Sequence, residues 1–282
     1  PYGANMSALT SSHLLSVFGF NENDIFVGGA EGTMLHYDGS QWSPMETGGR
    51  WTFKDIWGSA PDNVFAVVTD GRILHYDGKT WAPDDDMEKL PPMNGIFGLS
   101  SDEIYACSRL GKILRYDGSS WKYTQTGTDT DVTRLWGCKE SGMLAVGYDG
   151  LVLKQDGEGW TRMTFNSNAE FYGVCGFGPE EVYIVGSEGA IFKFNGVEMT
   201  EMPSQTMEFI LDVWGPSREM VFAVGDEGMI LYLDDNEWTR IESNTKEYLT
   251  GIWGSSEDNI YAIGDNGLIL RWNGEDWKAV EC

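Results

Sequence analysis

The chain has 282 residues, with 44 acidic against 19 basic side chains and a formal net charge of −25. Such a surface repels nucleic acid and anionic membranes, and it favours cations, basic protein partners or plain solubility. No run of about 18 apolar residues occurs, so the sequence predicts no membrane span.

Residues 1–12 lie outside the repeat described below, and we expect them to form a tail or an added edge strand. The chain begins with Pro1 rather than Met. This start fits a removed signal peptide, and it also fits a cloned fragment.

A large hydrophobic residue followed by Gly then recurs seven times. The steps between neighbouring copies are 39, 40, 39, 39, 39 and 39 residues. A period of about forty residues is typical of a solenoid or a propeller. The seven pairs are Phe18-Gly19, Trp57-Gly58, Phe97-Gly98, Trp136-Gly137, Cys175-Gly176, Trp214-Gly215 and Trp253-Gly254.

Each unit contains four short runs rich in β-branched and aromatic residues. In the last unit they are residues 248–254, 259–264, 268–272 and 277–281, separated by turns of Ser, Asp, Asn, Glu and Gly. These are strand and turn signals, and no stretch has helical length and period. The sequence therefore predicts an all-β, seven-bladed β-propeller with four antiparallel strands per blade and about 39 residues per repeat. Residues 13–282 form its single domain.

Two columns of the repeat have a structural interpretation. A Gly before the third strand occurs in all seven units and suits a tight turn with positive φ. A Trp in the fourth strand occurs in six units and suits blade-to-blade core. The fifth unit departs most, because Cys175, Asn195 and Met199 replace the usual residues. The two columns are Gly32, Gly71, Gly111, Gly150, Gly189, Gly228, Gly267 and Trp42, Trp81, Trp121, Trp160, Trp238, Trp277.

The repeat resembles propeller repeats of many bacterial secreted proteins. It is similar to the photosystem II assembly-factor-like propellers and, more loosely, to the Asp-box repeats of sialidases. The similarity rests on the Trp-Gly pairs and on Asp-Gly-x-x-Trp, found at Asp38 to Trp42, Asp77 to Trp81, Asp117 to Trp121 and Asp156 to Trp160. A full Asp-box has a second Gly and a Thr before Trp, which are missing here. The resemblance covers residues 13–281, implies a structural turn without catalytic residues, and suggests a periplasmic or extracellular location.

The resemblance also implies that the first strand of each unit is innermost. Two residues before each anchor, the units then place Ser16, Asp55, Gly95, Arg134, Gly173, Asp212 and Gly251 at the axial channel. Asp55, Arg134 and Asp212 are the charged members. They form either a mutually neutralising, water-filled channel or a site for a small polar ligand or cation.

The turns between the second and third strands are acidic in six units. Together with the connections between units they define what we call the acidic turn face. Hard cations prefer such oxygen ligands, but no Asp-x-Asp-x-Asp-Gly loop marks a dedicated calcium site. This face is either a solvated rim or a contact surface for a basic partner, oriented by Arg109. Its candidate residues are Glu31, Trp51, Asp70, Arg109, Asp149, Glu188, Asp226 and Asp265.

A row of basic residues on the third strand should pair with acidic groups of the adjacent blade. Its members are His36, His75, Arg115, Lys154, Lys193 and Arg271. Cysteine is uninformative about compartment, because no Cys-x-x-Cys pair occurs. Cys138 and Cys175 lie near the ends of first strands in adjacent units, where a disulfide would fit, although we favour free thiols.

Catalytic patterns are scarce. The three His residues form neither a metal-binding cluster nor a Ser-His-Asp arrangement. Asp55 and Asp212 alone are weak grounds for a glycosidase. We therefore expect a non-enzymatic binding or assembly module without a cofactor, presenting the acidic turn face to a protein with a basic surface. It would be monomeric unless part of a larger complex. The alternatives are a carbohydrate-acting hydrolase or lyase that uses the channel carboxylates, and a sugar-binding lectin propeller.

Overall fold

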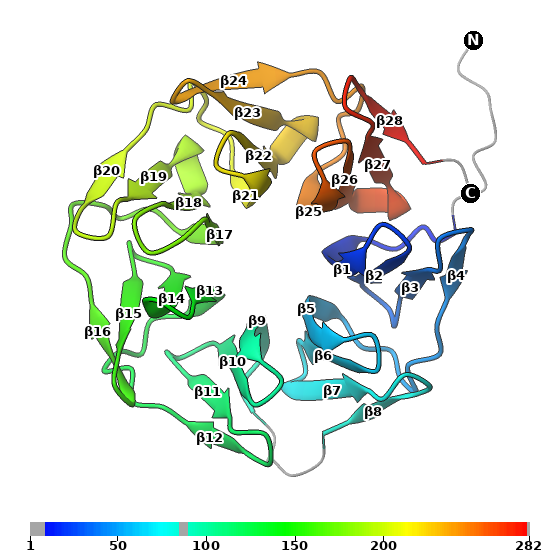
Figure 1. The fold of residues 1–282 in the computed structure, drawn as a ribbon, viewed down its shortest axis with the longest axis horizontal. Helices are drawn as coiled ribbons and strands as arrows, with labels where there is room; N and C mark the ends of the chain where they lie inside the picture. The colour runs from blue at the N-terminus through cyan, green and yellow to red at the C-terminus, as the bar shows by residue number, and fades with distance from the viewer. Residues whose placement is uncertain (1–8, 85–89, 281–282) are drawn as a thin grey trace.

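Each forty-residue unit folds into one antiparallel sheet of four strands, in a computed structural model that describes residues 9–84 and 90–280 (Figure 1). The strands of a sheet follow one another along the chain, so every blade is built from consecutive strands. Short β-branched runs joined by tight turns can pair only with their immediate neighbours, which accounts for this order.

The first four blades have the following strands. Blade 1 contains β1 (Leu14–Asn21), β2 (Asp24–Gly29), β3 (Met34–Tyr37) and β4 (Trp42–Pro44). Blade 2 contains β5 (Phe53–Ala60), β6 (Asn63–Val68), β7 (Arg72–Tyr76) and β8 (Trp81–Pro83). Blade 3 contains β9 (Met93–Ser100), β10 (Glu103–Ser108), β11 (Ile113–Tyr116) and β12 (Trp121–Tyr123). Blade 4 contains β13 (Val132–Cys138), β14 (Gly142–Gly147), β15 (Val152–Asp156) and β16 (Gly159–Arg162).

The last three blades each add one short 3-10 turn between their second and third strands. Blade 5 contains β17 (Phe171–Gly176), β18 (Val182–Gly186), η1 (Ser187–Gly189), β19 (Ile191–Phe194) and β20 (Met199–Glu201). Blade 6 contains β21 (Ile210–Ser217), β22 (Met220–Gly225), η2 (Asp226–Gly228), β23 (Ile230–Asp234) and β24 (Glu237–Ile241). Blade 7 contains β25 (Leu249–Ser256), β26 (Asn259–Gly264), η3 (Asp265–Gly267), β27 (Ile269–Trp272) and β28 (Trp277–Ala279).

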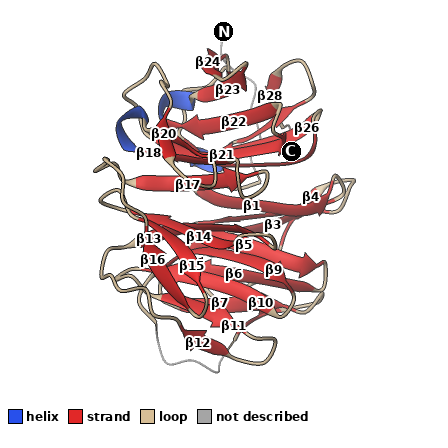
Figure 2. Cartoon of the chain, turned by 60° about the vertical axis from the view of Figure 1, so that its left-hand side comes forward, coloured by secondary structure: helices blue, strands red, loops and turns tan. Residues whose placement is uncertain are grey.

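The seven sheets form a closed ring around an open centre. The first strand of every blade is innermost and the fourth lies at the rim, as Figure 1 shows. Seen from the side, the sheets follow one another around the ring (Figure 2). Strand β1 lies beside β25, so blade 1 closes the ring against blade 7. The predicted seven-bladed propeller is confirmed.

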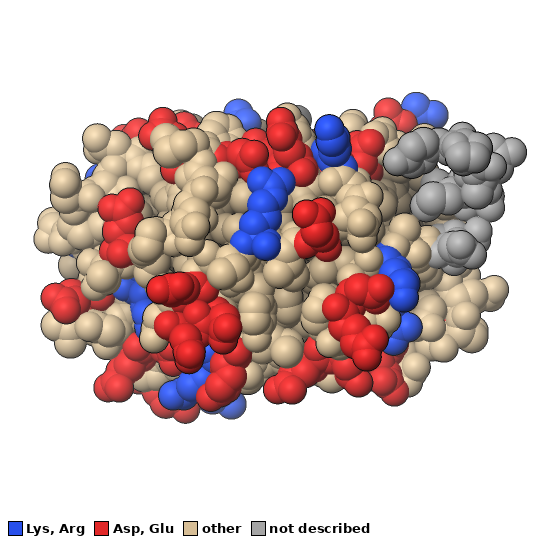
Figure 3. Space-filling view, turned by 90° about the horizontal axis from the view of Figure 1, so that it is seen from above, with Lys and Arg blue, Asp and Glu red and all other residues tan. Residues whose placement is uncertain are grey.

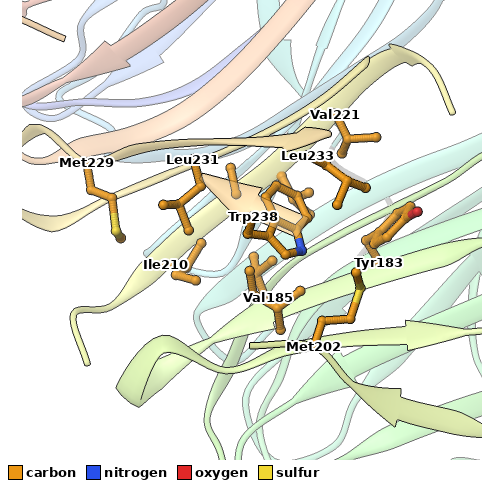
Figure 4. Packing of buried hydrophobic residues seen from close by; sticks show 12 residues of the cluster. Tyr183, Val185, Met202, Ile210, Val221, Met229, Leu231, Leu233 and Trp238 are labelled. Carbon is orange, nitrogen blue, oxygen red and sulfur yellow. The ribbon is translucent and has the colours of Figure 1, made fainter. Parts of the chain in front are cut away.

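The fourth-strand Trp residues pack between blades, as predicted. Between blades 5 and 6, for example, Trp238 meets Tyr183 edge to face at a centroid distance of 6.1 Å, within an apolar cluster (Figure 4). The equivalent Trp of blade 1 packs in the same way, because Trp42 lies 6.1 Å from Tyr261 of blade 7. Aromatic burial of this kind therefore holds neighbouring sheets face to face around the ring.

The Gly that precedes the third strand in every repeat has positive φ in all seven blades, from +63° at Gly150 to +85° at Gly32 and Gly71. A side chain would also collide with the connection to the next blade. A Cβ on Gly111 would lie 2.0 Å from the Thr128 carbonyl oxygen, and one on Gly267 would lie 2.0 Å from that of Thr10. Both conformation and space therefore require Gly in this turn.

Five of the six basic residues on the third strand, all but Lys154, find a partner within their own blade, so for these five the prediction of partners on the adjacent blade is wrong. Lys193 Nζ lies 2.7 Å from Glu181 Oε1, and His36 Nε2 lies 2.6 Å from Asp24 Oδ1. Antiparallel pairing explains this, because third-strand residues lie directly across from the second strand of the same sheet.

Blades 1 and 7 share no strand, so side chains and packing close the ring. Thr250 Oγ1 donates to the Leu14 carbonyl at 2.6 Å, and His13 Nδ1 lies 2.6 Å from Asp265 Oδ1. Residues 9–13 contain no strand. Leu9 packs against the apolar cluster between these two blades. Residues 1–8 and Cys282, on which part of the terminal predictions fall, lie outside the described residues.

The described cysteines Cys107, Cys138 and Cys175 are all free. Cys107 is fully buried, and its burial raises the pKa of the thiol. The free-thiol interpretation is therefore confirmed for these three residues.

Candidate functional site

Asp55 links three blades at the channel. Its Oδ2 accepts a hydrogen bond from the Ile96 backbone N–H at 2.9 Å, and its Oδ1 accepts one from Ser16 Oγ at 3.2 Å. The next blade has Gly95 at the equivalent position. Asp55 therefore connects β5 to both neighbouring inner strands.

Asp212 repeats this arrangement on the other side of the ring. Its Oδ2 accepts the Ile252 N–H at 3.0 Å, and its Oδ1 accepts the N–H of Val213 at 3.0 Å. Here too the neighbouring blade carries a Gly, Gly251, at the equivalent position. Both carboxylates thus have a structural role in joining adjacent inner strands.

Arg134 supplies the positive charge between them. Its Nη1 donates to the backbone carbonyls of Asn94 at 2.8 Å and Thr133 at 3.2 Å rather than to a carboxylate. Arg134 therefore acts on Asp55 and Asp212 through space. The channel column is brought together as predicted, whereas ligand binding there remains a prediction.

Burial controls the titration of these groups. It raises the pKa of Asp212 to about 6, and the charge of Arg134 only partly opposes this rise. Burial also raises the pKa of Asp55, and the charge of Arg134 again opposes this rise. The two carboxylates keep the pKa of Arg134 above its ordinary value although burial acts against its charge.

The channel has a cavity at each end. At the ends of the inner strands lies the larger one, about 480 Å³, which contains Asp55, Arg134 and Asp212. The smaller one, about 180 Å³, lies where the inner strands begin, at the acidic turn face, and is lined by Lys54, Asn94, Arg134, Tyr148 and Tyr172 among others. Arg134 lines both, so it lies at the junction of the two cavities.

Basic side chains lie beside several carboxylates of the acidic turn face. Asp265 pairs with His13, and Asp70 Oδ2 lies 3.4 Å from Arg72 Nη1. Arg109 Nε lies 3.8 Å from Asp131 Oδ2. Trp51 is not a free aromatic anchor, because its Nε1 donates to the Thr47 carbonyl at 3.0 Å and its ring lies beneath the guanidinium of Arg72.

Three of the predicted residues point away from the protein at the tips of their turns. Glu31, Asp149 and Glu188 are exposed and adopt left-handed backbone conformations, with φ between +53° and +57°. In blade 6 this tip position belongs to Glu227, while Asp226 lies one residue earlier and is half-buried. Figure 3 shows one side of the ring edge-on, with acidic side chains and interspersed basic ones.

An aromatic surface that the repeat pattern does not mark lies on the same face. The rings of Tyr148 and Tyr172 are 6.3 Å apart, and those of Tyr172 and Phe209 are 6.0 Å apart, so the three form a continuous row across blades 4 to 6. We call these three residues the aromatic arc. Exposed Leu110 and Tyr248 lie on the flanking blades 3 and 7.

Each residue of the arc occupies a different position in the repeat, so no column of the sequence marks it. Tyr148 stands where other units carry Ala30, Thr69 or Ser187. The available signal was an aromatic residue in a turn column that is otherwise small or charged. An exposed aromatic row on a protein surface is usually buried by a binding partner.

Among the described residues, no cluster of three or more His, Cys, Asp or Glu side chains could hold a metal ion. The helical segments of the described ranges are single 3-10 turns, and none could cross a membrane. The acidic turns thus carry charge without forming a multidentate oxygen cage.

The fold and site define a seven-bladed propeller with a charged axial channel and an acidic, aromatic face. The sequence matches no protein-family model and no curated protein. Solved structures match it in fold. The structure of YCF48 bound to D1 peptide has 18% sequence identity and a TM-score of 0.77, covering 93% of this chain and 94% of that one.

Two further structures extend the comparison. YCF48 from Cyanidioschyzon merolae has 16% identity and a TM-score of 0.76, covering 95% of this chain and 97% of that one. The computationally designed Ika8 protein has 13% identity and a TM-score of 0.72, covering 98% of this chain and 87% of that one. At these identities the similarity establishes the fold.

Proposed function

We propose that this propeller is a non-enzymatic protein-binding module whose contact surface is the aromatic arc with its surrounding carboxylates. The ligand is an extended segment of a partner protein that carries both apolar and basic side chains. The observation that carries the proposal is the unbroken row of Tyr148, Tyr172 and Phe209 across three blades.

The carboxylates around the arc favour a basic segment, while Lys54 and Arg134 line the adjoining cavity. Tyr172 Oη donates to Glu170 Oε2 at 2.6 Å, and the Leu110 N–H donates to Asp131 Oδ1 at 2.9 Å. Asp226 lies at the other end, where its N–H donates to the Phe209 carbonyl at 3.0 Å. Carboxylates beside exposed rings can bind Lys or Arg while the rings contact apolar side chains.

The fold comparison is consistent with this proposal, since one similar structure is a YCF48 complex with a peptide. The channel carboxylates support it indirectly. Asp55 and Asp212 both accept backbone hydrogen bonds from neighbouring strands, so their geometry is explained without a catalytic role.

The test uses short fluorescent peptides that alternate Lys and Leu, compared with peptides in which Ser replaces Leu or Glu replaces Lys. The Lys/Leu peptide should bind best, and binding should weaken as salt is raised. Tyr148→Ser with Phe209→Ser should reduce affinity by about tenfold or more through lost apolar contact. Glu170→Gln with Asp226→Asn should reduce both affinity and its salt dependence.

The matched control is Asp62→Asn with Glu257→Gln, which removes two exposed charges from turns on the opposite face. This variant should bind the Lys/Leu peptide like the wild type. Equal binding of the Lys/Leu and Lys/Ser peptides, or equal loss in the control variant, would contradict the proposal.

A further inference from the structure

The larger channel cavity has the size of a small-molecule site and lies away from the acidic turn face. Its volume of about 480 Å³ lies within the range of typical ligand pockets, roughly 300–1,000 Å³. Aromatic and aliphatic side chains line its wall, and its base is charged. The aromatic lining residues are Phe18, Trp57, Phe97, Trp136, Phe177, Trp214 and Trp253.

Each indole of this wall is held in place by a Gly of the next blade. A Cβ on Gly98 would lie 2.4 Å from Cη2 of Trp57, and one on Gly19 would lie 2.6 Å from Cη2 of Trp253. The Trp rings therefore lie against the neighbouring backbone at positions where only Gly leaves room for them. Trp57, Trp214 and Trp253 remain partly exposed, and they line the cavity.

The base of the cavity has an excess of one negative charge when its groups are ionised, with Asp55 and Asp212 against Arg134. Both carboxylates already accept backbone N–H groups, as described above. A ligand that brings charge but few hydrogen-bond donors suits such oxygens better than one that must donate several bonds. Aromatic rings attract the same kind of ligand, because their faces are electron-rich.

We propose that this cavity binds an organic monocation of the alkylated ammonium class, with its charge toward Asp55 and Asp212 and its alkyl groups against the indoles. The channel column predicted a small polar ligand or a cation, and this proposal specifies the class of cation. It is independent of the protein-binding face, which lies at the other end of the channel.

Binding should depend on pH. Arg134, Asp55 and Cys175 are the titratable or charged groups that act on Asp212. A bound cation stabilises the ionised carboxylate, so affinity should fall as the pH is lowered through the pKa of Asp212, about 6.

The probes are choline, its neutral isostere with carbon in place of the nitrogen, methyl glucoside and sodium chloride. Tryptophan fluorescence and calorimetry report binding, because the wall contains four of the Trp residues. Choline should bind at least about tenfold more tightly than the neutral isostere, and the glucoside and Na⁺ should cause no saturable change.

Asp212→Asn should weaken choline binding by about tenfold and remove its pH dependence near 6, while keeping an acceptor for the Ile252 N–H. Trp214→Phe gives a second test that retains a ring, and it should weaken binding less than Asp212→Asn. Asp235→Asn, in the exposed turn between β23 and β24 of the same blade, is the matched control and should bind like the wild type.

Circular dichroism establishes that each variant is folded. Equal affinity for choline and its neutral isostere, saturable glucoside binding, or unchanged choline affinity in folded Asp212→Asn would overturn the assignment. The absence of any saturable response to choline would overturn it as well.

Discussion

Two kinds of residue at the channel have different structural roles. Asp55 and Asp212 join neighbouring inner strands through backbone N–H groups, whereas Trp57 and Trp253 cover a Gly of the next blade. Charged groups at such a place must be compensated, and Arg134 does so only in part. The carboxylates therefore stabilise the ring through hydrogen bonds and destabilise it through buried charge.

Asp212 should make stability depend on pH. Its pKa is raised from 3.8 to about 6 by burial, so the native state binds more protons than the unfolded state between these values. The free energy of unfolding should therefore be highest, as far as Asp212 contributes, below about pH 4 and fall as the pH rises through 6. Between about pH 4 and 7 the free energy of unfolding of the wild type should fall by on the order of 1–3 kcal/mol relative to that of Asp212→Asn.

Urea unfolding of both proteins across this range measures that difference. Asp102→Asn is the control, because the Ser100 hydroxyl lowers the pKa of this exposed carboxyl. Its difference from the wild type should stay constant between about pH 5 and 7. The difference in unfolding free energy between the wild type and Asp212→Asn could instead stay constant or change in the opposite sense. Either result would show that the pKa of the Asp212 carboxyl is not raised.

At the scale of the element, the inner strands use two versions of one contact. Where the anchor is Trp, its ring covers the Gly of the next blade. Blades 1, 3 and 5 lack that Trp, and the residue two positions later covers the Gly instead. A Cβ on Gly58 would lie 2.7 Å from Phe20, one on Gly137 would lie 3.3 Å from Leu99, and one on Gly215 would lie 3.1 Å from Phe177.

This substitution explains the unusual fifth unit. Cys175 supplies no ring for this contact, although its thiol reaches the backbone of Gly215 in the next blade, and Phe177 packs against the apolar cluster between blades 5 and 6. Met199 likewise packs in one apolar cluster with Phe194 and Leu144. Leu144 of unit 4 stands where other units carry the aromatic residue that contacts the Trp of the next blade. The departures from the repeat are therefore compensated by neighbours.

Phe177→Ser should lower the free energy of unfolding by about 2–4 kcal/mol, because it removes a ring from this contact. Adding Cys175→Trp should restore a substantial part, since Trp followed two residues later by a small residue is the arrangement of blades 2 and 7, with Ser59 and Ser255. Denaturant unfolding measures both. If Cys175→Trp lowers stability equally in the presence and absence of Phe177, the two positions do not exchange this role.

For the whole molecule, the central question is how the ring stays closed. Every sheet is made of consecutive strands, so no strand crosses from blade 7 to blade 1. The Thr250 and His13 contacts and the apolar cluster around Leu14 and Tyr261 hold this junction. Other junctions have a covalent connection in addition, which makes this one the natural place for opening.

A circular permutant can test this idea. The two ends of this 282-residue chain are joined by a flexible linker, and the chain is opened before Val197, in the exposed turn between β19 and β20. Strand β20 then pairs with β19 from the opposite end of the chain, and backbone hydrogen bonds close the ring. We expect a free energy of unfolding about 1–3 kcal/mol higher than in a permutant opened between β16 and β17, which shares no strand.

Circular dichroism and denaturant midpoints with m values compare the two permutants. Equal stability of both would mean that packing between complete blades already closes the ring as firmly as a shared strand. Lower stability of the permutant opened before Val197 would contradict the expectation outright.

The architecture could be predicted from sequence because it is a local and repeated property. The spacing of Gly, the strand lengths and the turn residues recur with one period, and chain connectivity then leaves a sequential four-stranded sheet as the simplest outcome. The positive φ of the turn Gly follows from the same local logic. The channel column also followed from spacing, once the first strand was taken to be innermost.

The sites depended on tertiary structure. Tyr148, Tyr172 and Phe209 come from different positions in three units, and only blade packing brings their rings together. The same holds for the bond from Asp212 to Ile252 and for the Phe177 contact with Gly215. The sequence by itself determined the number of blades, because a period repeats along the chain. Tertiary structure decided the surfaces, because their neighbours belong to separate repeats that meet only in the ring.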